Sequence, residues 1–234
     1  MLSLKAYGAT ALLLFVTLVT CSIAQAQETE TRREFWPELD VFIPLKPRFR
    51  LGITATVTRV EETKEDTEAS IGAHIDFTPR KDITFRAGYR YGFSLTDSNS
   101  YKEHRIILEQ TYRRTIPLAI LLSDRNREEL RFLNGNFSGR YRNRLTLERE
   151  FSLRKLRLTP YASGEVFYDT RFDIWNRNRL TGGIQVPLKR GFPIIGLLDP
   201  GRIAVLDLYL MRQNDSRSEP SRVVGFGATF NLYW

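Results

Sequence analysis

The stretch Val224-Gly-Phe-Gly-Ala-Thr-Phe-Asn-Leu-Tyr-Trp234 ends the chain and indicates the fold. Every second residue in it is apolar, and the residues between them are mostly small or polar. A period of two residues is typical of a β-strand with one apolar face and one small or polar face. A soluble sheet can contain such a strand, but an outer-membrane barrel explains it better. In a barrel one face meets lipid, the other meets a polar lumen, and aromatic residues lie at the membrane interface.

The N-terminus has the three parts of a secretory signal peptide. Lys5 gives a basic start, Ala11–Val19 is a short apolar run, and Ala24-Gln-Ala26 is a small-x-small cleavage site. The apolar run is shorter than the roughly 20 residues of a membrane-spanning helix. The expected organisation is a cleaved signal peptide, a short N-terminal segment and one barrel domain: residues 1–26, 27–34 and 35–234.

Composition narrows the chemistry and the partners. The net charge is +8, but an exported basic chain meets outer-membrane lipid and anionic solutes, and we expect no nucleic-acid partner. Cys21 is the only cysteine, and its position leaves lipidation open as an alternative to cleavage after Ala26. Cleavage would leave no thiol in the mature chain. Two distant histidines provide no ligand spacing, so we expect no metal and no cofactor.

The two-residue period recurs along the chain, and no long segment has helical spacing. It predicts eleven strands: Phe35–Ile43, Arg48–Val60, Ser70–Thr78, Ile83–Ser94, Tyr101–Arg113, Ile120–Leu133, Phe137–Leu153, Leu156–Tyr168, Trp175–Leu188, Ile203–Gln213 and Val223–Trp234. Strands of roughly 10 residues can cross a bilayer when tilted. Because bacterial barrels usually have an even number of strands, we expect an all-β, antiparallel up-and-down transmembrane β-barrel of about ten to twelve strands, preferably twelve.

Aromatic residues and connections fit the same architecture. We expect the interfacial aromatic belts of the membrane to include the following residues: Trp36, Tyr91, Phe93, Trp175 and Trp234. The polar stretch Glu61–Glu68 is suited to an exposed outward loop. The apolar connection Lys189–Gly201 is the exception, and we place it on the periplasmic side at the membrane interface.

Several stretches resemble an uncharacterised family of bacterial outer-membrane β-barrels. They are Phe35–Pro44, Tyr101–Glu109, Tyr141–Glu150, Pro160–Arg171, Leu206–Asn214 and Asn231–Trp234. The resemblance covers residues 34–234 and implies the fold and the outer-membrane location. It implies no activity, because the family's function is unknown. By resemblance to outer-membrane proteins in general, the aromatic-terminated last strand is the segment that the barrel-assembly machinery binds, although the family usually ends in phenylalanine.

If the apolar faces meet lipid, the alternate residues line the lumen. The candidates are Arg86, Arg90, Arg125, Arg127, Arg131, Arg140, Arg142, Arg144, Glu148, Glu165 and Arg179. Arginine and carboxylate side chains pair well, and charges away from bulk water need partners. The first interpretation is therefore an integral barrel with a salt-bridged lumen and a structural or unknown role.

A channel is the main alternative. Arg140, Arg142 and Arg144 form a column of like charge, which would attract and pass anions unless every member is paired. The mature size and the basic lumen are similar in architecture to small porins for acidic oligosaccharides.

A lipid hydrolase of the outer membrane is the third alternative. It would need a serine, a histidine base and an orienting group. Ser70, His74 and Asp76 share one strand face, whereas His104 faces the rim or lipid. A lone histidine in a strand is usually structural, so we expect no enzymatic activity.

Overall fold

The computed structural model describes residues 30–60, 67–96, 101–153, 156–188, 203–216 and 221–234. The expected signal peptide with Cys21, the loop residues 61–66 and the whole apolar connection Lys189–Gly201 lie outside the described residues. Within these ranges, the model contains no helix that is both long enough and apolar enough to cross a bilayer.

Residues 31–234 form one compact unit, which consists almost entirely of strands. The elements are β1 (Glu30–Lys46), β2 (Phe49–Val60), β3 (Thr67–Arg80), β4 (Ile83–Ser94), β5 (Lys102–Ile116), the 3-10 turn η1 (Pro117–Ala119), β6 (Ile120–Leu133), β7 (Asn136–Glu148), β8 (Phe151–Leu153), β9 (Leu156–Asp169), β10 (Ile174–Leu188), β11 (Ile203–Asp215) and β12 (Ser221–Tyr233). The prediction of an all-β barrel is confirmed.

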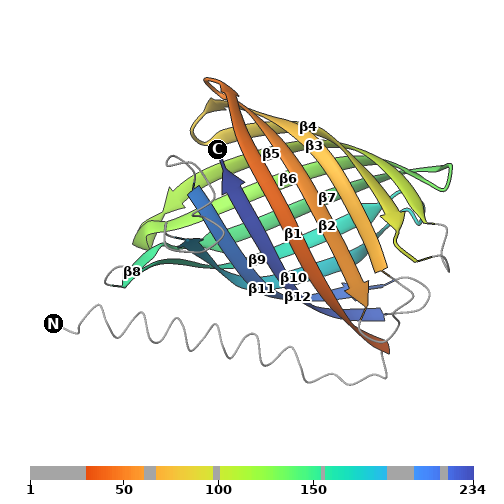
Figure 1. The fold of residues 1–234 in the computed structure, drawn as a ribbon. Helices are drawn as coiled ribbons and strands as arrows, with labels where there is room; N and C mark the ends of the chain where they lie inside the picture. Colours follow the sequence, from red (N-terminus) through yellow and green to blue (C-terminus); the bar gives the residue numbers. More distant parts are fainter. Residues whose placement is uncertain (1–29, 61–66, 97–100, 154–155, 189–202, 217–220) are drawn as a thin grey trace. The chain divides into compact units, whose positions relative to one another are not determined.

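The sheet closes on itself, as Figure 1 shows. Hydrogen bonding connects the strands in one continuous order from β10 through β12 and β1 to β9, and β9 also pairs with β10. Among the strands that the structure describes, the short strand β8 pairs with β9 alone. The wall therefore has eleven strands. The preferred number, twelve, is the number of strand elements and not the number of strands in the wall.

The predicted strand Phe137–Leu153 is divided in two. Its partner β9 has Pro160 just beyond the last pair of the ladder, Glu148 with Tyr161. Proline has no amide hydrogen to donate, so regular pairing lapses there, and only the bond from the Arg149 amide to the Pro160 carbonyl (3.2 Å) spans the gap. Pairing resumes where Phe151 meets Leu158, which makes β8 a separate strand.

Local sequence sets the tightest connection. Asn134 and Gly135 join β6 to β7 with φ of 48° and 84°. Two central residues with positive φ match the twist of a two-residue hairpin, and Asn-Gly is the sequence that adopts this turn most readily. The turn fixes the register of β6 against β7, from Leu133 opposite Asn136 down to Leu121 opposite Glu148.

The seam between β1 and β12 is parallel. All ten other neighbouring pairs of wall strands are antiparallel, so the first and the last strand run in the same direction. Two ring stacks across the seam agree with this direction: Phe35 stacks on Phe226 (5.7 Å between centroids) and Phe42 stacks on Tyr233 (4.9 Å). The partners are 191 residues apart in the sequence in both pairs, and such a constant offset is typical of parallel strands. The amide of Trp234 donates to the Phe42 carbonyl (2.9 Å). An odd number of strands closes only in this way.

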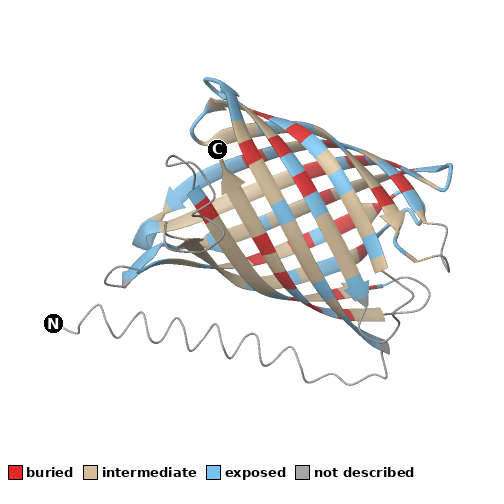
Figure 2. Cartoon of the chain, viewed as in Figure 1, coloured by how far each residue is buried: buried red, intermediate tan, exposed pale blue. Residues whose placement is uncertain are grey.

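Burial is inverted relative to a soluble barrel. Of the described residues that are buried, seventeen are polar or charged and six are hydrophobic. Figure 2 shows buried and exposed residues alternating along the strands. Large apolar side chains such as Ile71, Leu210 and Phe226 are exposed on the outer face. The interior is thus polar, and the apolar faces of the strands point outward.

The parallel seam predicts a specific cross-link. In a Cys21→Ala background, Phe35→Cys with Phe226→Cys should form a disulfide or short maleimide link, because their rings stack across the seam. The link should be visible as altered mobility on electrophoresis. Val41→Cys with Ile53→Cys, opposite one another in the antiparallel β1–β2 pair, is the positive control. A linked control without a linked seam would contradict the parallel closure.

Candidate functional site

The lumen contains a cavity of about 960 Å³. On β11 it is lined by every second residue from Val205 to Asp215, and on β12 its lining runs from Ser221 to Tyr233. These positions cover nearly the whole length of both strands. The cavity therefore extends along most of the height of this side of the barrel.

The wall formed by β6, β7 and β9 is a network of arginines held by carboxylates. Arg142 donates to Glu129 (2.9 Å) and to Glu165 (2.8 Å), and so joins two buried acidic residues. Glu129 also accepts from Arg140 (2.7 Å), and Glu165 also accepts from Arg144 (2.9 Å). Each buried carboxylate thus has several guanidinium partners, which is the condition under which buried charge is tolerated.

A second cluster lies toward the β4–β5 connection. Glu103 pairs with Arg105 and Arg131, and Arg131 also reaches Asp169 (3.4 Å). Tyr101, which precedes β5, donates to Glu103 (2.5 Å). Burial and the nearby Glu103 carboxylate raise the pKa of the Tyr101 hydroxyl above its usual range, so this group remains a donor.

A buried phenylalanine lies among these charges. Phe167 is 1% exposed, and the guanidinium carbon of Arg142 lies 4.7 Å from its ring centroid, with that of Arg179 at 5.3 Å. Arg179 also lies over Trp36 (4.7 Å) and donates to Gln213 (2.6 Å). The negative ring faces stabilise guanidinium groups without neutralising them. This arrangement keeps Arg179 at the cavity surface.

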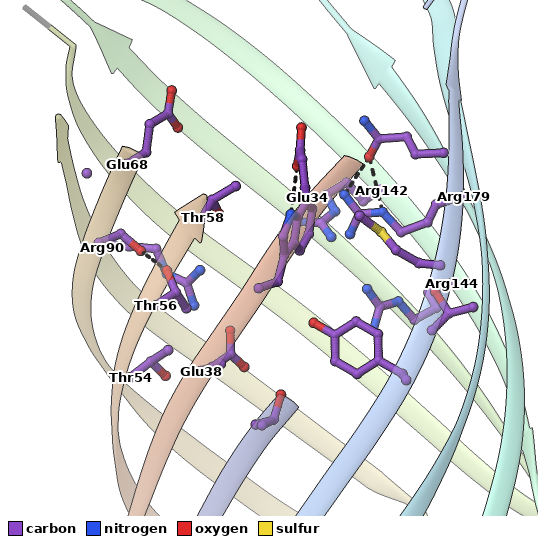
Figure 3. A pocket seen from close by; sticks show the side chains of 18 of the residues that line it. Glu34, Glu38, Thr54, Thr56, Thr58, Glu68, Arg90, Arg142, Arg144 and Arg179 are labelled. Carbon is purple, nitrogen blue, oxygen red and sulfur yellow. Dashed lines mark hydrogen bonds between the residues drawn. The ribbon is translucent and has the colours of Figure 1, made fainter. Parts of the chain in front are cut away.

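The wall of β1–β3 is mainly polar. Figure 3 shows Glu38 of β1, Thr54 and Thr56 of β2, and Arg90 of β4 around one side of the cavity. Thr54 donates to Asp40 (2.5 Å). Arg90 lines the cavity and has no hydrogen bond or ion pair with any residue that the structure describes.

The lining of the cavity contains more arginines than acidic residues. Thirteen lining residues are arginines, and seven are Asp or Glu. The inward carboxylates that do not line the cavity are Asp76, Glu109, Glu129, Glu148, Glu165 and Asp169. Glu129 and Glu165 are less than 3% exposed, and their partner arginines lie between them and the cavity. The space therefore meets guanidinium groups more than carboxylates.

Residues 33–222 match the family model described as Protein of unknown function (DUF2490). The match covers most of the chain. The chain belongs to the DUF2490 family. Comparisons with curated proteins and with solved structures gave no match. Membership agrees with the resemblance to an uncharacterised family and leaves the function of this DUF2490 protein to be argued from its lumen.

The structure brings most of the predicted lumen residues together in this DUF2490 barrel. Nine of the eleven line the cavity: Arg86, Arg90, Arg125, Arg127, Arg131, Arg140, Arg142, Arg144 and Arg179. Glu165 lies beneath them as a common acceptor. Glu148 does not line the cavity, although the alternation of β7 places it on the lumen face.

The assignment of one aromatic residue, Trp36, to the membrane interface is wrong. Trp36 faces the cavity, because Phe35 is the residue of this strand that points outward and stacks on Phe226. Trp175 and Trp234 are about half exposed, at 57% and 49%. Tyr91 and Phe93 stack on one another (5.6 Å) on the outward face of β4. For these four, the membrane interface remains a prediction.

The cavity is also lined by three residues that were not among the predicted lumen residues: Phe167, Tyr209 and Arg177. Phe167 could have been found, because it lies between Glu165 and Asp169 in the two-residue period. Its aromatic character instead suggests the lipid face. Arg177 lies next to the irregular pairing at Trp175, where the period of β10 is shifted.

The histidine side chains lie apart from any serine. Ser70 shares a hydrogen bond with Thr56 (2.6 Å), and His74 Nε2 lies 3.8 Å from Asp76. His104 pairs with the Tyr89 hydroxyl on the outer face (2.6 Å). Among the described residues there is no serine–histidine hydrogen bond. The described ranges also contain no cluster of three potential metal ligands.

The network predicts a stability loss at Glu165. Glu165→Gln keeps the shape but removes the charge shared by Arg125, Arg142 and Arg144. Removing one partner from a buried ion pair costs about 3 kcal/mol or more, so the free energy of unfolding in urea should fall by that amount. The exposed Glu150→Gln is the control and should change it little. Equal stability of both variants would contradict the role of the network.

Proposed function

We propose that this protein is an integral outer-membrane β-barrel whose lumen passes small anionic solutes. The membrane part of the proposal is supported by the apolar outer face, the polar interior and the expected signal peptide. Outer-membrane lipid would cover the apolar faces. The barrel-assembly machinery would bind the last strand, β12.

The positive cavity surface carries the channel part of the proposal. The cavity follows β11 and β12 along most of their length, and its lining has thirteen arginines against seven acidic residues. A positive, polar path through a low-dielectric wall raises the local concentration of anions and lowers their barrier to passage. A purely structural barrel would not need a continuous space of this volume.

The ion pairs give the path a fixed wall. Arginines such as Arg142 and Arg144 are held at the wall by Glu129 and Glu165, so they do not collapse into the cavity. Because these guanidinium groups already have carboxylate partners, an entering anion would bind to them weakly and could leave again. Weak, repeated sites are what conduction requires. The preference for anions would come from the number of these weak sites.

Conductance tests the channel directly. Pure refolded protein in a planar bilayer should carry a current that favours chloride over potassium. Arg90→Gln should lower this permeability ratio by about twofold, since it removes one positive group from the lining. Arg90 has no ion pair with a described residue, so the change leaves no carboxylate unpaired.

Arg114→Gln is the matched control for the conductance experiment. It removes the same charge from an exposed residue that does not line the cavity, and the alternation of β5 places it on the outward face. The control should keep the wild-type ratio. No current from correctly folded protein, or a preference for cations, would overturn the channel and leave the structural role.

The terminal strand predicts an assembly defect. Phe226 and Phe230 lie on the outward face of β12, and Trp234 follows directly after the strand. Phe226 also contacts Phe35 at the seam. Replacing all three with serine should reduce the amount of protein in the outer-membrane fraction and of heat-modifiable barrel on electrophoresis. Thr229→Ser with Asn231→Ser changes only the lumen face of the same strand and serves as control. Normal membrane assembly of the triple variant would refute this role.

A further inference from the structure

The middle of β6 has no apolar face. Residues 123–129 read Ser-Asp-Arg-Asn-Arg-Glu-Glu. Arg125 and Arg127 point into the lumen and line the cavity. The alternation of a strand therefore places Asp124, Asn126 and Glu128 on the outer face. In the proposed membrane location, these three polar side chains point away from the lumen.

The neighbouring strands extend this polar surface. Gln110 of β5 lies opposite Asn126, and Asn143 of β7 lies opposite Asn126 on the other side. Asn143 donates to Asp124 (2.7 Å) and to Asn126 (3.0 Å), and Tyr141 also donates to Asn126 (2.5 Å). We call Gln110, Asp124, Asn126, Glu128 and Asn143 the outer polar patch.

The outer polar patch lies at mid-height in the wall. Asn126 is the seventh of fourteen residues in β6, and Asn143 is the eighth of thirteen in β7. Exposed apolar side chains lie around it on the same strands: Ile106, Leu108, Leu130, Phe132, Leu145 and Leu147. Strands β3 and β12 have alternating apolar outer residues instead. Lipid tails offer no hydrogen bonds, so polar groups at this depth need another cover.

The outer polar patch has hydrogen-bond donors and hydrogen-bond acceptors that have no partner among the described residues. The Asn126 side chain accepts twice through its oxygen, and its amide nitrogen donates to no residue in the described part of the chain. The Gln110 amide and the Glu128 carboxylate also make no hydrogen bond with any described residue. Gln110 and Glu128 are both exposed. A covering surface must therefore supply donors and acceptors together.

We propose that a second copy of this chain covers the outer polar patch, so that the barrel is a homodimer through β5–β7. This inference depends on the membrane part of the proposed function and not on the channel. A twofold axis along the membrane normal brings residues of equal depth together, so the same patch meets itself. Asn and Gln amides are self-complementary, because each carries a donor and an acceptor. The free amide hydrogens of one copy can then meet the free carboxylate oxygens of the other.

A cysteine at the centre of the outer polar patch tests the contact in native membranes. In a Cys21→Ala background, Asn126→Cys should give a species of twice the monomer mass with a short bismaleimide. Ala228→Cys, on the outward face of β12, should remain monomeric. No link at Asn126, or a link to a protein of different mass, would overturn the homodimer. Absence of the protein from the outer-membrane fraction would also overturn it, together with the membrane location.

A second experiment measures the association without cysteines. Asn126→Leu with Asn143→Leu should shift the detergent-solubilised protein from dimer to monomer in size-exclusion chromatography with light scattering. Heat-modifiable mobility should remain and would show that the barrel is folded. Asn178→Leu with Asn214→Leu removes another hydrogen-bonded amide pair, near the ends of β10 and β11, and should leave the dimer intact. A wild-type monomer, or a dimer that survives the patch variant, would refute the proposal, whereas anion conductance would be unaffected by either result.

Discussion

The pairing of guanidinium groups with buried carboxylates is the constraint on which the rest of this barrel depends. Arg142 joins Glu129 to Glu165, and each of these acids binds further arginines. A strand with charge on its inner face can only be stable if those charges compensate one another. The same strands then have their apolar residues on the outside, where a soluble protein would expose them to water. The inner ion pairs and the proposed membrane location are therefore two parts of one solution.

The odd number of strands follows from how the wall closes. Ten antiparallel pairings leave β1 and β12 running in the same direction, and the stacks of Phe35 on Phe226 and Phe42 on Tyr233 fix their register. Parallel pairing is slightly weaker per residue than antiparallel pairing. Aromatic stacking on both faces of the seam offsets this weakness. The cavity lies against the same two strands, so the seam is also part of the lumen wall.

Much of this fold was readable from a period of two residues, because burial inside a barrel alternates along every strand. Nine of the thirteen arginines that line the cavity follow from that period alone. The period fails where local pairing departs from it: Pro160 divides one predicted strand, and the irregular pairing at Trp175 hides Arg177. At Trp36 and Phe167 the period holds, but their aromatic rings suggest lipid and so mislead the assignment. Guanidinium groups can occupy the faces of aromatic rings, so such residues can lie among charges.

The middle of β6 shows why the two faces of a strand must be considered separately. Its inner residues belong to the lumen network, whereas Asp124, Asn126 and Glu128 cannot reach that network from the outer face. Hydrogen bonds donated by Asn143 and Tyr141 pair only some of the polar atoms of these side chains. A sequence that had to satisfy lipid alone would place apolar residues there, as β12 does. The polar outer face of β6 therefore points to a second requirement on this strand, which the lumen does not explain and which contact with another protein surface would meet.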